Sequence, residues 1–276
     1  RFENARRIVS LDCDFIGAEQ EAYRYIRGFA NGRKLSSPND EINRLYVIEG
    51  LFSLTGTNAD HRLRVAPSHV VCATARLLQE IAGGDAGSHV QRLAAEFKGD
   101  AKWIVECAKD LKSSENQGKS LILAGHQQPL EVHLMALAIN QALGNLGSTV
   151  AMLPAPIVKE GSIEDLAASL NAGQVDTLVM LGVNPAYTAP VDLEWSKAQA
   201  KAKAVIRWAY YEDESAAGVT WHLPAAHYLE SWGDARSGDG TLVPVQPLIE
   251  PLFGGVTDLE VLARLAGLDV TKPYEI

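Results

Sequence analysis

Short apolar runs alternate with stretches of helical periodicity along the chain. The runs that predict buried strands cover residues 7–11, 45–48, 120–124, 149–153, 177–181 and 204–208. The stretches that predict helices cover residues 19–30, 70–81, 89–97, 101–111, 130–143, 163–172, 193–202 and 258–265. Because strands that alternate with helices are joined by right-handed crossovers, the pattern predicts an α/β fold with mostly parallel sheets.

Polar stretches without periodicity divide this pattern. Residues 112–119 (KSSENQGK) predict a linker, so we expect two Rossmann-like lobes, residues 1–114 and 115–276. Residues 49–65 predict an irregular loop. Residues 210–255 are rich in Pro, Gly and Trp and predict a long ordered loop region with short strands in the second lobe. The segments IVSLDCDF and LVMLGVNP are weakly similar, which reflects either the common form of βαβ units or two related nucleotide-type sites.

Charge and cysteine content exclude several kinds of protein. The 276 residues include 25 Lys and Arg against 34 Asp and Glu, a net charge of −9, which disfavours binding to a nucleic-acid backbone. No apolar run approaches the roughly 20 residues of a membrane span. Cys13, Cys72 and Cys107 are far apart and include no CxxC pair. We therefore expect buried free thiols, and neither a zinc site nor an iron–sulfur cluster held by one local segment.

Two turns that contain glycine follow predicted strands, where open α/β sheets bind their ligands. Gly182, Asn184 and Pro185 belong to a GxNP turn, whose Asn could hydrogen-bond a purine edge or a phosphate; the alternative is a turn and nothing more. Gly125 and His126 precede the predicted helix at 130–143, a place suited to an anion. The segment is neither a P-loop nor GxGxxG, and His126 is alternatively a capping or solvent-facing residue.

The densest group of polar and aromatic residues lies at 221–234. His222 and His227 are five residues apart with Pro224 between them, which is not the spacing of a helical metal-binding pair, and HExxH is absent, so we expect no metal site. Three carboxylates at strand ends are either general bases or solvated turn residues: Asp12, Asp14 and Glu49. With no GxSxG elbow and no local Cys–His signature, we assign no catalytic residue.

Three segments together resemble the molybdopterin oxidoreductase superfamily. They are NRLYVIEGLFSLTGTNADHRL (43–63), LILAGHQQPLEVHLMALAINQALGNLG (121–147), and a third that runs from LVMLGVNPAYTAP through DESA to HLPAAHYLESWGDARSGDGTLVPVQPLIEPLFGG (178–255). The resemblance covers most of the chain, and its last part is the most specific. It is closest to the large iron–sulfur subunit of bacterial alternative complex III, a quinol oxidoreductase, with the polysulfide and tetrathionate reductases as near relatives.

In that superfamily the matching elements line the sites of two pterin guanine dinucleotides that hold molybdenum or tungsten. If this cofactor binds, the resemblance implies the following contacts: Gly125, His126, Gly182, Asn184, Pro185, Glu214, Ser215, Leu223, Pro224, Glu230 and Gly233. The first-lobe counterpart of the GxNP turn is Asp12-Cys13-Asp14-Phe15, whose carboxylates would repel a pyrophosphate. Cys13 is the only nominee for a molybdenum ligand, and we expect a buried structural thiol instead.

The resemblance implies a cofactor-free scaffold domain within the iron–sulfur subunit of a membrane-associated quinol oxidoreductase. The chain starts at Arg1 without Met, and we expect a piece of a longer protein, not catalytic by itself. Its partners would be other subunits of a respiratory complex and a ferredoxin-like domain that holds the clusters, on the periplasmic side of the bacterial inner membrane. The alternative is part of a catalytic bis-pterin reductase of the polysulfide or tetrathionate type. A free-standing nucleotide binder at 125–129 has only a strand–glycine–helix pattern in its favour.

Overall fold

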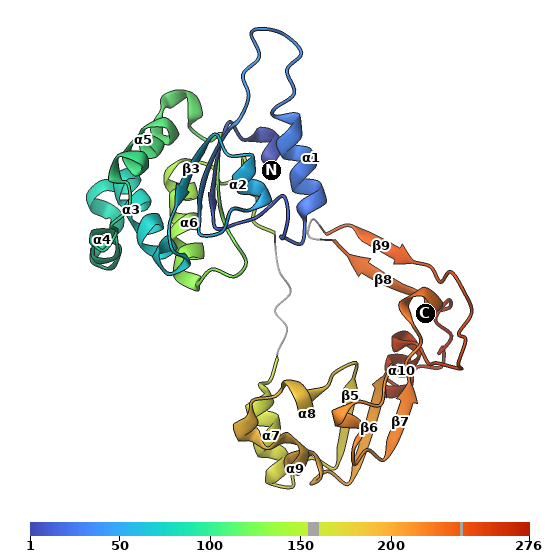
Figure 1. Ribbon diagram of the computed structural model, residues 1–276. Helices are drawn as coiled ribbons and strands as arrows, with labels where there is room; N and C mark the ends of the chain where they lie inside the picture. The colour runs from blue at the N-terminus through green and yellow to red at the C-terminus, as the bar shows by residue number, and fades with distance from the viewer. Residues whose placement is uncertain (154–159, 238–239) are drawn as a thin grey trace. The chain divides into compact units, whose positions relative to one another are not determined.

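The computed structural model describes residues 1–153, 160–237 and 240–276, and the chain divides into two compact units, Arg1–Pro154 and Ala155–Ile276. A four-stranded parallel sheet forms the centre of the first unit (Figure 1). Its strands, in spatial order, are β3 (His61–Arg64), β2 (Arg44–Glu49), β1 (Arg7–Leu11) and β4 (Ser120–Ala124). β1 pairs with both β2 and β4 along its five residues, so these three strands end at the same edge.

Helices cover both faces of this sheet. One face packs against α3 (Val70–Ala82), α5 (Ala101–Lys112) and α6 (Leu130–Ala142), with α4 (Ser88–Ala95) beside α3; the other face packs against α1 (Ala22–Asn31) (Figure 1). Alternate strand residues supply the two cores: Val9 and Leu11 enter one, and Ile8 enters the other beside Phe15 and Phe29. Because both faces are covered, β1, β2 and β4 are mostly apolar, as in other parallel sheets, whereas the edge strand β3 buries only Leu63.

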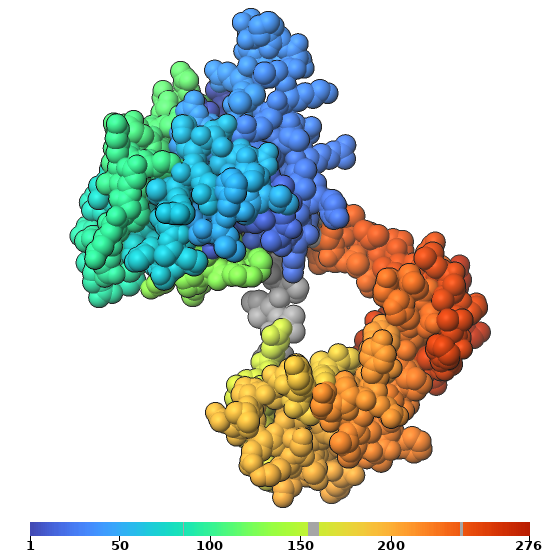
Figure 2. All heavy atoms as spheres, viewed as in Figure 1, coloured from blue at the N-terminus to red at the C-terminus, as the bar shows by residue number. Residues whose placement is uncertain are grey.

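Short elements complete the first unit. The four-residue α2 (Leu54–Thr57) follows β2, and four 3-10 helices lie at Phe2–Asn4, Pro67–His69, Gly83–Ala86 and Ser114–Asn116. Asp100 begins α5 by accepting a hydrogen bond from the backbone N–H of Trp103 (3.1 Å), and Gly83, with φ +63°, ends α3. The loop between α1 and β2 projects away from the rest of the unit (Figures 1 and 2).

The second unit contains a three-stranded parallel sheet with the order β5 (Thr177–Leu181), β6 (Ala204–Ala209) and β7 (Trp221–Pro224). α7 (Ile163–Asn171) and α9 (Trp195–Gln199) cover one face, over a core that includes Leu178, Met180 and Val205. On the opposite face, side chains of all three strands line a groove of about 350 Å³ against α10 (Asp258–Leu265). None of these opposite-face strand residues is part of a buried core cluster among the described residues.

The remaining elements of the second unit are short. α8 (Pro185–Thr188) follows β5, and an antiparallel hairpin joins β8 (Gly233–Arg236) to β9 (Leu242–Val245). Three 3-10 helices lie at Val191–Leu193, Glu214–Ala216 and Tyr228–Glu230. Within the described ranges, no helix is both long and apolar enough to cross a membrane.

The α/β class with parallel sheets is confirmed, and β1, β4, β5 and α10 have the predicted bounds. Two local predictions are wrong. Residues 149–153 form no strand, because the backbone groups of Val150 bond within a local turn, to the carbonyl of Asn145 and the N–H of Gly147. The predicted loop at 49–65 contains β3, which pairs with β2 from Tyr46↔His61 to Glu49↔Arg64.

The predicted boundary at 114/115 does not coincide with the division of the chain. Residues 120–124 form β4, which pairs with the central strand of the first sheet, so the first compact unit extends to Pro154. The polar segment at 112–119 is a tight connection within that unit. The Asn116 side chain there is buried and donates to the backbone carbonyl of Asp110 (2.7 Å).

Candidate functional site

Two predicted site segments meet at the carboxyl edge of the second sheet. Asn184 follows β5 and Ser215 follows β6. The Asn184 amide donates to Glu214 Oε2 (2.8 Å), and its carbonyl oxygen accepts from the Ser215 hydroxyl (2.7 Å). Ser215 Oγ accepts from the backbone N–H of Ala186 at the start of α8 (2.9 Å). We name Asn184, Glu214 and Ser215 the amide triad.

The backbone around the amide triad follows from its sequence. Gly182 adopts φ +66°, a left-handed conformation that favours glycine, and its N–H donates to the carbonyl of Trp208 (2.8 Å). Pro185 occupies the first helical position of α8, where a missing N–H costs nothing. Asp213 caps the following 3-10 helix by accepting from the N–H of Ser215 (3.0 Å). Parallel pairing of β5 with β6 places the two strand ends side by side, and the turn residues then bring Asn184 to Ser215.

A buried arginine, which the sequence reasoning missed, supports this edge. Arg207 lies on β6 with 1% of its side chain exposed and forms an ion pair with Asp213. It donates to the carbonyl of Tyr211 (2.7 Å) and lies 3.5 Å from His222 Nδ1, while its Nε has no partner among the described residues. The sequence signal was a charged residue inside the apolar run AVIRW, since a buried charge requires a partner.

The other predicted residues of this unit serve different roles. Leu223 and Pro224 lie at the end of β7, and Leu223 lines the 350 Å³ groove. Glu230 accepts from the N–H groups of His227 (2.9 Å) and Leu252 (3.2 Å), so it fixes the loop backbone. Gly233 starts β8 and lines a separate hollow of about 180 Å³. No hydrogen bond described for these residues joins them to the amide triad.

The carboxylate of Glu214 is exposed and has a lowered pKa. Its pKa lies below the ordinary value because the Asn184 amide hydrogen-bonds the carboxylate, and the side chain is open to solvent. The described ranges hold no group of three or more His, Cys, Asp or Glu residues that could bind a metal. His222 lies beside Arg207, whereas His227 accepts from the N–H of Leu229 (3.3 Å), so the two histidines have separate roles.

In the first unit, Gly125 and His126 follow β4 and lie beside the carboxylate residues Asp12 and Glu19. A Cβ on residue 125 would lie 2.0 Å from the carbonyl oxygen of Asp12, so only glycine fits. Glu19 accepts from the backbone N–H of His126 (3.2 Å) and contacts its Nδ1 (3.2 Å). Asp12 accepts from the Gln128 amide (2.8 Å) and holds φ +50°, a strained conformation for a residue with a Cβ.

At the ends of β1 and β2, too, carboxylate side chains of the chain accept hydrogen bonds from nearby donors. Asp14 accepts from both the N–H (2.9 Å) and the hydroxyl (2.8 Å) of Thr55. Glu49, which is buried, accepts from the Ser53 hydroxyl (2.6 Å) and from Arg62 (2.5 Å). Several donors at this edge, from Gln128, His126, Thr55 and Ser53, are therefore bonded to the chain's own carboxylates.

The three cysteines are free and buried, as expected. Cys13 lies among the carboxylates of the first edge, and burial, reinforced by Glu19, raises the pKa of its thiol well above the ordinary range. A thiolate is the form that binds a metal, so this environment opposes a molybdenum ligand at Cys13.

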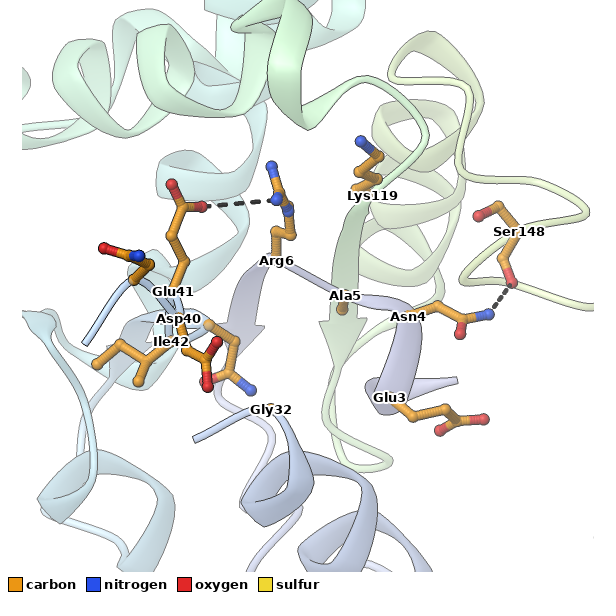
Figure 3. Close-up of a pocket in the computed structure, with 12 residues that line it drawn as sticks. Glu3, Asn4, Ala5, Arg6, Gly32, Asp40, Glu41, Ile42, Lys119 and Ser148 are labelled. Atoms are coloured by element: carbon orange, nitrogen blue, oxygen red, sulfur yellow. Dashed lines mark hydrogen bonds and ion pairs between the residues drawn. The ribbon is translucent and has the colours of Figure 1, made fainter. Parts of the chain in front are cut away.

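A hollow of about 710 Å³ lies at the opposite edge of the first sheet (Figure 3). Arg6 and Lys119, which precede β1 and β4, lie on one side, and Arg6 Nη2 is 3.6 Å from Glu41 Oε2. Asn4 donates to the carbonyl of Ser148 (3.4 Å). None of the predicted site residues lines this hollow.

No family profile and no curated protein matches the sequence. Among solved structures, acetylene hydratase from Pelobacter acetylenicus is similar to the whole of this chain, with 12% identity and a TM-score of 0.64, and the match covers 49% of that enzyme. A chain of the formyltransferase/hydrolase complex from Methylorubrum extorquens, in complex with methylofuran, matches 88% of this chain and 69% of its own length, with 14% identity and a TM-score of 0.50.

At these identities the comparisons show the fold alone. The chain spans about half the length of acetylene hydratase. Neither structure is an alternative complex III subunit, so that narrower resemblance stays a prediction.

Proposed function

We propose that this chain is a cofactor-free scaffold domain with a molybdopterin-type fold, in the iron–sulfur subunit of a membrane-associated quinol oxidoreductase. The observation that carries the proposal is the carboxylate-filled edge of the first sheet. There Asp12, Asp14 and Glu19 occupy the donors that would otherwise face a pyrophosphate. A phosphate about 4 Å from one of these carboxylates would be opposed by about 4 kcal/mol at an effective dielectric of ~20.

The first unit therefore does not fit a pterin guanine dinucleotide. Adding one would require breaking the Glu19 bond to the N–H of His126 and bringing the phosphates beside Asp12. The amide triad of the second unit has suitable residue types. However, Asn184 and Ser215 already bond each other, and Glu214 adds a carboxylate.

In the proposed role the domain holds no cofactor and docks neighbouring polypeptides. Its partners would be other subunits of the complex and a ferredoxin-like domain that carries the clusters, on the periplasmic side of the membrane. The net charge of −9 supplies an acidic surface for such partners. Electrons would pass through the cluster domain.

The test is elemental and pterin analysis of the purified full-length parent within its complex. Iron without molybdenum, tungsten or pterin is the expected result. Stoichiometric molybdenum or tungsten, together with the fluorescent oxidation product of the pterin, would overturn the proposal. It would favour the alternative, a bis-pterin reductase to which the amide triad contributes contacts.

A further inference from the structure

Four aromatic side chains and two carboxylates surround a hollow of about 180 Å³ in the second unit. The aromatic residues are Trp208, Tyr210, Tyr228 and Trp232, and the carboxylates are Asp234 and Asp258. They come from the end of β6, the 3-10 helix at 228–230, the start of β8 and the start of α10. We name this feature the aromatic hollow.

Hydrogen bonds and ring contacts hold the walls of the aromatic hollow in place. The Trp208 indole N–H donates to the carbonyl of Val256 (2.6 Å). The Trp232 ring packs against Tyr274 with centroids 5.0 Å apart, and the Tyr228 ring packs against His227 at 4.2 Å. Because these side chains are already held in place, binding would not carry the entropy cost of ordering them.

The carboxylates of the aromatic hollow have no cationic side chain beside them in the part of the chain that the structure describes. Among the described residues, no lysine or arginine lies within ion-pair distance of Asp234 or Asp258. Asp258 accepts from the N–H of Leu259 (2.9 Å), which leaves its second oxygen available. The faces of aromatic rings carry negative potential, so rings and carboxylates together attract a cation.

Size and surroundings decide what kind of cation fits. Sites for small-molecule ligands are typically about 300–1,000 Å³, so this hollow suits the head of one side chain. The segment 246–255 is tied to its rim, since Leu248 N–H donates to the carbonyl of Leu229 (2.7 Å), and it exposes Leu248, Leu252 and Phe253. A charged anchor pocket within an exposed apolar surface is typical of a protein–protein contact.

We propose that the aromatic hollow binds an arginine side chain of a partner polypeptide, with the guanidinium stacked on the indole rings and paired with Asp234 and Asp258. Arginine fits better than lysine because its planar head both stacks on aromatic faces and bonds carboxylates through two N–H groups. This inference names the partner chemistry for the docking role and rests on that proposed function.

The test begins with titration of N-acetyl-L-argininamide into the full 276-residue chain, followed by ligand-observed NMR. We expect saturable binding at millimolar concentration, as one stacked ion pair allows. Asp234→Asn should weaken binding about 3-fold and Trp232→Leu about 10-fold, whereas Trp232→Phe, which keeps a ring, should retain it. Asp165→Asn on α7 removes the same charge far along the chain and is the matched control. N-acetyl-citrullinamide, the uncharged isostere, should not bind.

Three results would overturn the inference. They are no binding of the arginine probe, binding by Asp234→Asn and Trp232→Leu as tight as by the unmodified chain, and binding of the citrulline probe as tight as that of the arginine probe. Circular dichroism on each variant shows whether it is folded, and the Phe variant preserves the test if Trp232→Leu unfolds. In the assembled complex, a photo-crosslinker in place of Tyr228 should label a partner peptide that contains arginine. Labelling only of peptides without arginine would contradict the partner assignment. Probe binding does not depend on metal content. Failure of the probe to bind would contradict the arginine site, whereas a pterin in the parent would contradict the proposed scaffold function.

Discussion

Removal of Asp213 and removal of Arg207 should have unequal effects on stability, although the two residues form one ion pair. Arg207 is 1% exposed and Asp213 is 27% exposed. Loss of one partner from a fully buried pair costs about 3–5 kcal/mol, because a charge is left without compensation. Since water reaches Asp213, we expect Asp213→Asn to cost less, about 2–3 kcal/mol in the free energy of unfolding.

Arg207→Met removes the buried charge itself and leaves an aspartate that water can solvate. The variant loses the hydrogen bond from Nη1 to the carbonyl of Tyr211, worth about 1 kcal/mol, and replaces an unpartnered Nε with apolar volume. We therefore expect Arg207→Met to cost about 1 kcal/mol. The double variant should cost less than the sum of the two single changes, because it leaves no buried arginine charge without a partner.

Urea unfolding followed by tryptophan fluorescence measures these differences. Four of the five tryptophans lie in the second unit, so the signal reports mainly on the unit that contains the pair. Asp176→Asn is the matched control, since its pair with Lys203 is 72% and 78% exposed and should change stability by about 0.5 kcal/mol or less. The reasoning is refuted if Arg207→Met destabilises the chain as much as Asp213→Asn, or if both match the control.

Three further predictions concern the first unit. Gly125→Ala should cost about 2–3 kcal/mol in chemical denaturation because its Cβ would meet the carbonyl oxygen of Asp12, whereas Gly161→Ala, with open space around it, should be near neutral; equal effects would contradict the close approach. Burial alone would raise the pKa of Asp110, but hydrogen bonds from Tyr46 and Arg7 hold that pKa below the ordinary value. The contribution of Asp110 to the free energy of unfolding is therefore present above about pH 4 and is lost as the pH falls through the lowered folded-state pKa. Acid titration of stability should therefore be shallower in Asp110→Asn than in the parent chain, and identical slopes would disprove this. The raised pKa and burial of Cys13 predict no reaction with a thiol reagent in the native chain at pH 8, and reaction of all three cysteines in urea; rapid native labelling at Cys13 would show an open site.

The sequence predicted the elements whose apolar pattern is strong, and it failed where a single buried residue decided the structure. β5 and α10 were found at their bounds, the first by a continuous apolar run and the second by helical periodicity. β3 was missed because only Leu63 of its four residues is buried, so HRLR has no apolar run. The segment 112–119 looked like a linker because the burial of Asn116 is set by tertiary packing.

The same distinction holds for the candidate site. The sequence placed Asn184 after a predicted strand, but it did not predict that Asn184 meets Ser215, which follows from the parallel pairing of β5 with β6. The sequence also placed Asp12 and Asp14 at the first edge. It did not reveal that Glu19, which lies further along the chain, accepts from the N–H of His126. Such long-range pairing leaves no local pattern.

The unequal covering of the two sheets has a consequence for how the chain opens. Both faces of β1 are buried in apolar cores, whereas the outer face of β5 and β6 borders a 350 Å³ groove beside one eight-residue helix. Amide protons of β1 should therefore exchange with solvent deuterium only in the deepest opening events, and those of β5 and β6 in shallower ones that leave the first unit intact. The chain would then behave as two foldons, and a single melting temperature would describe neither of them.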